Sequence, residues 1–404
     1  MLVVLQAARR PCASSSMRGH PLLRWFQAGV AAVDGRRRVQ AALGTRAAPS
    51  RWHLMAVGKA AVPMARGALD VWGATFGSGC VVAPTQPTEP LPARCQLYLG
   101  AHPLPDARSL QAGAALWAFA AALPPQEPVL LLVSGGASAL AEVLAPGATL
   151  QQLQALTAAG LSGGWDIATL NAQRRAVSLL KGGGLVARLG AARVEALVLS
   201  DVAGDDLTVV ASGLASGGAA APAAQLPSRL TCVGTLDDAL NAVQQAAAAA
   251  GVRLQRLPGR YTGDVEAVAV ACLAAWRTLP GDGLLWGGEP TVQLPPMPGR
   301  GGRNQHLALR AALAMAGDTR ASWLVAGTDG VDGNTPDAGA LVDGQTVRRG
   351  ELGLGVTAAQ ALAAADSGTF LEAAGALVHT GPTDTNVGDI LIALRLPAGP
   401  EGSR

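Results

Sequence analysis

Short apolar runs alternate with segments of helical periodicity along most of the chain. The run RWHLMAV at 51–57 precedes VPMARGALDVW at 62–72, in which apolar residues recur at helical spacing. Further strands are expected at GCVVAP, EPVLLLV and VEALVLS, with a helix over SLQAGAALWAFAAAL between the first two. Strands that alternate with helices form βαβ units, so the pattern predicts a Rossmann-like, mostly parallel sheet, doubly wound if helices cover both its faces.

A Pro- and Ala-rich stretch, GLASGGAAAPAAQLPSR at 213–229, interrupts the alternation before it starts again. A chain of 404 residues is also long enough to bury two cores. We therefore expect a Rossmann-like N-terminal domain over 21–228 and a smaller α/β domain over 229–398. Residues 1–20 are basic and contain a second methionine, so we expect them to be an extension outside the fold.

Composition narrows the class of protein. The net charge is only +3, and Arg36–Arg38 is the longest basic run, which gives no footprint for nucleic acid. The five cysteines form no CxxC pair, so neither a disulfide framework nor a zinc site is indicated. Apolar runs are shorter than a membrane span. These features favour a cytoplasmic protein that acts on small molecules, and they leave a homodimer open.

Five expected strands end in a polar or glycine-rich cluster: VGKA, VSGGASA, LSDVAGDD, WGGEPTV and AGTDGVDG. Glycines after strands are often only turn residues. In open α/β sheets, however, ligands bind beyond the carboxyl ends of the strands, where such clusters converge. Five clusters that together carry Lys, Ser, Glu and Asp predict a functional site at these strand ends.

Lysine is rare in this chain, which makes its two lysines informative. Of 31 cationic residues, Lys59 and Lys181 are the lysines and the other 29 are arginines. Arginine replaces lysine wherever only positive charge is needed, but not where a compact ammonium group is required. Lys59 is therefore a candidate working residue. Lys181, in KGGGL, is either an anion contact or a solvated lysine before a glycine cap.

The clusters contain the groups that phosphoryl transfer needs. A glycine loop before a helix can hold phosphate or carboxylate through its N–H groups, and such a loop contains Ser134, Gly135, Gly136 and Ser138. The Gly-rich loop GRGGRN offers the guanidinium groups of Arg300 and Arg303 and the amide of Asn304 for gripping an anion. Carboxylates for Mg²⁺ or for general-base work are Asp201, Asp205, Asp206, Asp329, Asp332 and Asp337.

The motifs VGKA, HPLPDA, SGGASAL, LSDVAGDD, GGEPTVQL, GRGGRNQHLAL, GTDGVDG and HTGPTDTNVGDI stand in this order along the chain. In this the chain resembles the class II glycerate kinases, the MOFRL family, from about residue 57 to 394. The resemblance implies a two-domain α/β enzyme that uses ATP and Mg²⁺ to phosphorylate D-glycerate to 2-phosphoglycerate, with the active site in the cleft between the domains. It places the catalytic lysine, arginine and aspartate on Lys59, Arg303 and Asp329.

Further site residues follow from the same motifs. We expect substrate or phosphate contacts from the SGGASA loop, Lys181, Glu289, Asn304, Asp332, Thr383 and Asn386, and metal ligation by Asp201 and Asp205. One departure from the family is Leu236, which replaces a usual Asn in a strand–helix turn. Two alternatives stay open: an NAD(P)H-dependent hydroxypyruvate reductase and a non-catalytic sugar-phosphate-binding regulator. The reductase would need a G-x-G-x-x-G motif after a strand, and the regulator would not need Lys59, Arg303 and Asp329.

Overall fold

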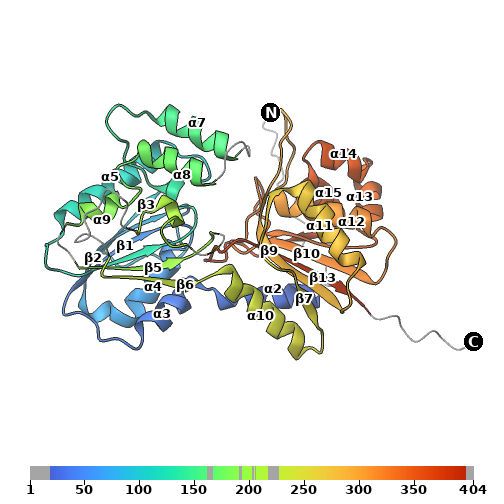
Figure 1. Ribbon diagram of the computed structural model, residues 1–404, viewed down its shortest axis with the longest axis horizontal. Coiled ribbons are helices and arrows are strands. Elements are labelled where there is room, and N and C mark those ends of the chain that lie inside the picture. The colour runs from blue at the N-terminus through green and yellow to red at the C-terminus, as the bar shows by residue number, and fades with distance from the viewer. Residues whose placement is uncertain are drawn as a thin grey trace, which may run out of the picture.

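The structure, a computed structural model, describes residues 19–161, 167–190, 193–202, 204, 206–216 and 227–396. Two lobes are visible, each built on its own β-sheet (Figure 1). Most of the expected N-terminal extension, much of the Pro- and Ala-rich stretch, and Asp205 lie outside the described residues. Within the described part, no helix combines the length and the apolar character needed to cross a bilayer.

The first lobe contains a six-stranded sheet in the order β3-β2-β1-β4-β5-β6, in which every neighbouring pair is parallel. Its strands are β1 (Trp52–Val57), β2 (Phe76–Ala83), β3 (Cys95–Leu99), β4 (Val129–Val133), β5 (Val194–Leu199) and β6 (Arg229–Gly234). Its helices are α3 (Gly35–Leu43), α4 (Ala61–Trp72), α5 (Ala107–Ala122), α6 (Ala137–Leu140), α7 (Leu150–Leu161), α8 (Ile167–Ala176) and α9 (Gly184–Arg188), with 3₁₀ turns η1 (Gly73–Thr75) and η3 (Val210–Ser212).

Both faces of this sheet are covered, which confirms the doubly wound expectation. Along β1, Leu54 and Ala56 pack into one cluster with α3 and α4, whereas Met55 and Val57 pack into another with α5 and α9. Successive strand residues point to opposite faces, so a strand that is buried on both faces is apolar at every position. This is why the sequence shows a continuous apolar run at 52–57.

The second lobe contains a mixed sheet in the order β12-β11-β10-β13-β9-β7, with β8 paired to β9. Its strands are β7 (Leu254–Arg256), β8 (Tyr261–Asp264), β9 (Gly283–Thr291), β10 (Ala321–Gly327), β11 (Gly339–Asp343), β12 (Leu377–Val378) and β13 (Asp389–Arg395). One face is covered by α11 (Val265–Arg277), α12 (Arg303–Ala314), α13 (Thr346–Leu354), α14 (Ala358–Ala363) and α15 (Ser367–Ala373). The central strands β10 and β13 are antiparallel, with Gly327 opposite Asp389.

The other face of the second sheet is covered by a helix from the start of the chain. Helix α2 (Pro21–Ala32) packs along α10 (Leu236–Ala249), and both lie against the second sheet (Figure 1). The packing is close, because a Cβ atom on Gly29 would lie 2.8 Å from Val243 Cγ2. From α2, which packs in the second lobe, the chain therefore enters the first lobe through α3.

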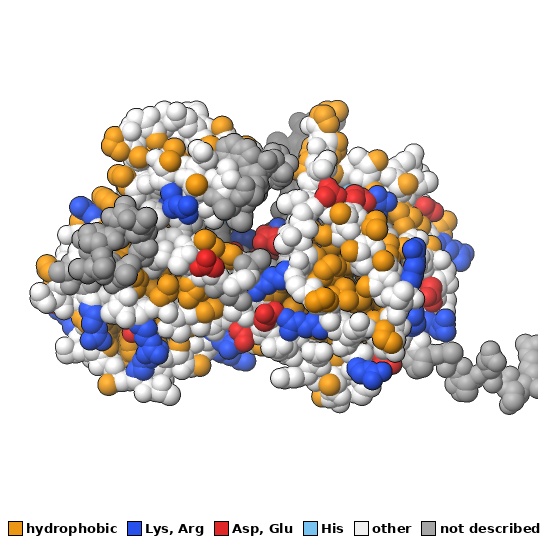
Figure 2. All heavy atoms as spheres, in the orientation of Figure 1, with side chains coloured by type: hydrophobic (Ala, Val, Ile, Leu, Met, Phe, Trp, Pro, Cys, Tyr) orange, Lys and Arg blue, Asp and Glu red, His pale blue; other side chains and the backbone are white. Residues whose placement is uncertain are grey.

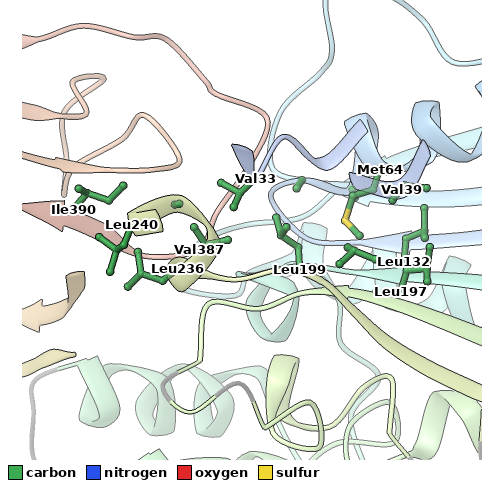
Figure 3. Close-up of a cluster of buried hydrophobic side chains, with 14 of the residues drawn as sticks. Val33, Val39, Met64, Leu132, Leu197, Leu199, Leu236, Leu240, Val387 and Ile390 are labelled. Atoms are coloured by element: carbon green, nitrogen blue, oxygen red, sulfur yellow. The ribbon is translucent and has the colours of Figure 1, made fainter. Parts of the chain in front are cut away.

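A single hydrophobic cluster joins the two lobes. Val33, Leu199, Leu236 and Val387 lie along it from the end of α2 and the first sheet to the second sheet (Figure 3). Leu236, the departure noted in the sequence, is 1% exposed within this cluster. The strand β6 pairs with β5, so the first sheet extends beyond the expected boundary at residue 228. We therefore propose that the division between the domains follows β6 and that α2 belongs with the second one.

Candidate active site

Three strand ends of the first sheet meet at one place. Lys59 follows β1, and its backbone N–H donates to the carbonyl of Gly135 after β4 at 2.9 Å. The N–H of Ala60 donates to Ser134 Oγ at 3.0 Å, so the two loops hold each other. A Cβ atom on Gly135 would lie 2.0 Å from Asp201 Oδ2, which comes from the end of β5. Glycine at 135 thus lets Asp201 approach the loop backbone directly.

Lys59 reaches across to the second lobe. Its Nζ donates to Asp329 Oδ2 at 2.6 Å, and the two side chains are 23% and 13% exposed. Burial alone would raise the pKa of Asp329, but the charge and hydrogen bond of Lys59 outweigh it and hold the pKa below its usual value. Asp329 is therefore ionised at neutral pH. This pair brings together two of the three residues predicted to be catalytic, 270 residues apart in the chain.

Arg303, the third predicted catalytic residue, is the first residue of α12. Its Nε and Nη2 donate to the two carboxylate oxygens of Asp389 at 2.6 and 3.2 Å, and its Nη1 lies 2.8 Å from Glu289 Oε1. Burial would lower the pKa of Arg303, but these two carboxylates raise it above its usual value. A fork held from two sides has a fixed orientation. Figure 2 shows a hollow between the lobes, with side chains of both charges near its floor.

Asp332 and Asn304 bind each other at the start of α12. The carboxylate of Asp332 accepts the backbone N–H groups of Asn304 and Gln305 at 3.0 and 2.7 Å. The Asn304 side-chain amide donates to the same carboxylate at 3.3 Å. Burial raises the pKa of Asp332 to about 7, although these N–H groups favour its ionised form. This arrangement satisfies the free N–H groups of the helix that presents Arg303.

Hydrogen bonds connect the glycine loop of the first lobe to η3 and α8. Ser138 Oγ and Ser212 Oγ are 2.9 Å apart, and Ser212 Oγ donates to Asn171 Oδ1 at 2.8 Å. Ala211 and Ser212 both adopt positive φ angles of 52° and 57°. Non-glycine residues adopt such angles at a cost, which the surrounding contacts must offset. The contacts of Ser212 with Ser138 and Asn171 therefore hold this strained turn against the glycine loop.

Lys181 is not brought to the site. Its ammonium group donates to Glu142, and both side chains are fully buried. Burial lowers the pKa of Lys181, and Glu142 opposes that shift. The same carboxylate accepts the hydroxyl of Ser178. In this structure Lys181 thus occupies a buried ion pair and presents no charge to the cleft.

The remaining predicted residues lie around the strand ends of both lobes. Asn386 Nδ2 donates to Asp201 Oδ2 at 3.3 Å, and the Thr383 N–H donates to the Asp329 carbonyl at 3.4 Å. Burial, followed by the charge of Glu289, raises the pKa of Asp201 to about 7. Among the described residues no group of three or more His, Cys, Asp or Glu side chains is arranged as a metal site.

Two residues of the site were missed by the sequence analysis. Asp389 opens β13, and because β13 is antiparallel to β10 its first residue lies beside the end of β10. A search limited to the carboxyl ends of strands cannot find such a residue. His102 follows β3, and its ring and Lys59 Cγ flank the same point above Gly136, 3.1 and 3.2 Å from a Cβ built there. The strand-end rule, applied to β3, would have found it.

Comparison with known protein families identifies the two parts of the chain. Residues 21–240 match a family described as a domain of unknown function, DUF4147, and residues 283–389 match the MOFRL family. A D-glycerate 2-kinase from Thermotoga maritima is 33% identical over 379 residues, which cover 84% of this chain and 90% of that protein. The chain belongs to the MOFRL-type glycerate kinase family.

Solved structures and other relatives extend this result. A crystal structure of glycerate kinase from Thermotoga maritima matches with a TM-score of 0.78 and 31% identity, covering 93% of this chain and 99% of that one. A protein of Agrobacterium vitis, named as a candidate hydroxypyruvate reductase, is 34% identical and covers 84% of this chain and 98% of its own length. Kinase and reductase names thus occur at the same level of similarity.

Proposed function

We propose that this member of the family transfers the γ-phosphoryl group of ATP to the 2-hydroxyl of D-glycerate, giving ADP and 2-phosphoglycerate. The observation that carries the proposal is the contact of 2.6 Å between Lys59 of the first lobe and Asp329 of the second. It joins the glycine loop, suited to phosphate, to the lobe that presents Arg303. A cation, a carboxylate and an anion-binding loop at one point are the requirements of phosphoryl transfer.

Each of the three residues has a proposed role. Asp329, ionised beside Lys59, accepts the hydroxyl proton of the acceptor as its oxygen attacks phosphorus and the bond to the ADP oxygen breaks. Lys59 neutralises charge on the transferred group as a compact ammonium ion. Arg303, held in a fixed orientation by Asp389 and Glu289, supplies positive charge that stabilises the anionic substrate groups. Positioning and electrostatics supply most of the rate in such reactions.

Mg²⁺ fits this site as a partner of the nucleotide. Protein-bound Mg²⁺ is commonly held by one or two carboxylates together with substrate phosphates, so a cluster of three ligands is not required. Asp201 lies at the glycine loop, and its raised pKa reflects a buried carboxylate without a full counter-charge. When bound, the ion would neutralise phosphate charge during transfer. We propose Asp201 as a ligand; Asp205 remains a sequence prediction.

The reductase alternative has less support from the residues. Hydride transfer from a nicotinamide cofactor in a Rossmann-like lobe usually uses a G-x-G-x-x-G turn after a strand. Here β1 is followed by GKAA and β4 by SGGASA. The non-catalytic regulator is also disfavoured, because the Lys59–Asp329 contact is made between lobes. A cytoplasmic location remains our expectation from composition.

One pair of assays on a single preparation tests the proposal. ADP release is followed with ATP, Mg²⁺ and D-glycerate, and NADH oxidation is followed with hydroxypyruvate. We expect D-glycerate-dependent ADP release that Asp329→Asn abolishes while ATP binding is retained, and no NADH oxidation. Hydroxypyruvate-dependent NADH oxidation without ADP release would overturn the proposal in favour of a reductase.

A further inference from the structure

The two cations of the candidate site are paired with carboxylates, whereas a cation on α8 has no such partner among the described residues. Lys59 is paired with Asp329, and Arg303 with Asp389 and Glu289. Arg174, in the last turn of α8, is half-buried, and no hydrogen bond or ion pair joins it to another described residue. An unpaired guanidinium group in such a place favours an anion as its partner.

Arg174 lies on the side of α8 that faces the glycine loop. One turn earlier on the same helix, Asn171 accepts the hydroxyl of Ser212, which in turn contacts Ser138 of that loop. Residues three apart share a helix face, so Arg174 is presented in the same direction as Asn171. The nearest carboxylate, Glu142, is already bound by Lys181 and Ser178. Arg174 therefore has capacity for a further anion.

His102 lies beside Lys59 of the catalytic pair. Its ring flanks Lys59 above Gly136, and part of it is exposed to the cleft. Desolvation by nearby protein atoms, with the charges of Lys59, Arg303 and Arg174, lowers its pKa to about 3 even though Asp329 opposes the shift. The ring is therefore neutral, with one N–H donor, and it makes no hydrogen bond to another described residue.

We propose that Arg174 and His102 form the subsite that recognises the carboxylate of the acceptor. This inference rests on the proposed function and assigns the acceptor end of the same site. In a 2-hydroxy acid the carboxylate is bonded to the carbon that carries the reacting hydroxyl, so it must lie directly beside the point where Lys59 meets Asp329. His102 occupies one side of that point. The planar fork of an arginine matches a carboxylate, and a neutral imidazole adds a donor without adding charge.

The test uses two acceptors that differ only in charge. D-glycerate and its amide, D-glyceramide, have the same hydroxyl groups, but the amide lacks the carboxylate. We expect Arg174→Ala to lower kcat/KM for D-glycerate by roughly 10- to 100-fold, the value of a charged hydrogen bond, and to leave kcat/KM for the amide and KM for ATP unchanged. His102→Ala should lower the preference for D-glycerate over the amide less than Arg174→Ala does. His102→Gln, which keeps a neutral donor, should retain part of that preference.

The neighbouring Arg175 supplies a matched control. It lies on the same helix and is exposed, and its stem packs near Gly182. Arg175→Ala also removes one positive charge. It should leave the ratio of kcat/KM for D-glycerate to kcat/KM for D-glyceramide unchanged. If Arg174→Ala lowers kcat/KM equally for both acceptors, or raises KM for ATP instead, the carboxylate assignment is wrong. Arg174→Lys, which keeps charge but loses the fork, decides the same question if the alanine variant does not fold.

A binding measurement separates this inference from the proposed function. Calorimetry of D-glycerate and D-glyceramide with the wild-type chain and Arg174→Ala needs no turnover. Preference for the carboxylate in the wild type that is lost in Arg174→Ala supports the subsite even if no phosphate is transferred. Equal binding of both molecules by the wild type overturns it, whatever the kinase assay shows.

Discussion

Lys59 makes its contact through a compact ammonium group, and arginine does not reproduce that property. We expect Lys59→Arg to lower kcat by about 10²-fold or more, because the planar guanidinium cannot occupy the same point beside Asp329 and the transferred phosphoryl group. Arg36→Lys, at an exposed ion pair with Asp70, is the control and should leave kcat unchanged. Steady-state kinetics with D-glycerate measure both. A Lys59→Arg enzyme within about threefold of the wild type would remove Lys59 from the mechanism.

The pH dependence of activity reports the state of Asp329. Its pKa is lowered in the folded chain, so the stability that it contributes is present above its unfolded pKa and is lost only as the pH falls through the lower folded value. Asp329 should therefore give no acid limb in kcat between pH 5 and 8. Lys59→Met removes the two largest contributions that oppose burial and leaves only the Val331 N–H and the charge of Arg303, so the pKa of Asp329 should rise and an acid limb should appear at higher pH. The ¹³C shift of the Asp329 carboxyl measures the same change directly; an unchanged titration would refute this account of the pair.

Residue identity indicated part of the candidate site, and the family resemblance assigned the catalytic roles. Lys59 stood out because lysine is rare in the chain, and Asp329 and Arg303 because they follow strand-end or glycine-rich motifs. Lys181 was equally rare, but its ammonium group is buried against Glu142. The rarity of lysine indicates that each lysine is retained for a reason, but it does not indicate whether that reason is catalysis or a buried ion pair.

At the scale of elements, the start of α12 and the start of β13 are fixed to each other by Arg303 and Asp389. We expect Asp389→Ala to lower kcat at least tenfold and the free energy of unfolding by about 1–3 kcal/mol, because a largely buried guanidinium loses its bidentate partner. Asp70→Ala is a matched control, since Asp70 holds Arg36 at 2.6 and 2.8 Å on the surface. That variant should lose about 0–1 kcal/mol and no activity. Equal losses in the two variants would show that Asp389 does not hold Arg303 for function.

The sequence predicted the order of strands and helices better than it predicted whether neighbouring strands run parallel or antiparallel. The alternation of strands and helices correctly indicated the parallel first sheet, because each helical crossover returns the chain in the same direction. In the second lobe β10 and β11 are antiparallel and are joined through a segment without a helix, so the parallel rule did not apply there. Asp389 was missed for this reason.

At the scale of the whole molecule, the cluster in Figure 3 couples the lobes. We expect Gly29→Val to destabilise the entire chain by about 1–3 kcal/mol, because its side chain would overpack against Val243 and the Ala239 carbonyl between α2 and α10. Calorimetry should show one transition at a lower temperature. Gly73→Ala, where nothing lies within 4 Å of the added Cβ, is the control and should change little. Two transitions, with only one of them shifted, would contradict a shared core.

The sequence pattern indicated two domains, but it did not indicate that α2, which precedes the first sheet in the chain, packs in the second lobe. The packing of α2 against α10 joins parts of the chain about 200 residues apart, and no local periodicity carries that information. The Lys59–Asp329 contact likewise depends on how the lobes close on each other. The family resemblance predicted that these residues act together, and in the structure their side chains are in direct contact beyond the ends of β1 and β10.

The most direct test of the central claim is the ³¹P NMR spectrum of the product formed from ATP, Mg²⁺ and D-glycerate. A phosphate on carbon 2 couples to one proton and gives a doublet, whereas a phosphate on carbon 3 couples to two protons and gives a triplet. We predict a new doublet that grows as the β- and γ-phosphate signals of ATP are replaced by those of ADP, and that is absent with Asp329→Asn. A triplet, or no phosphate ester at all, would contradict transfer to the 2-hydroxyl at this site.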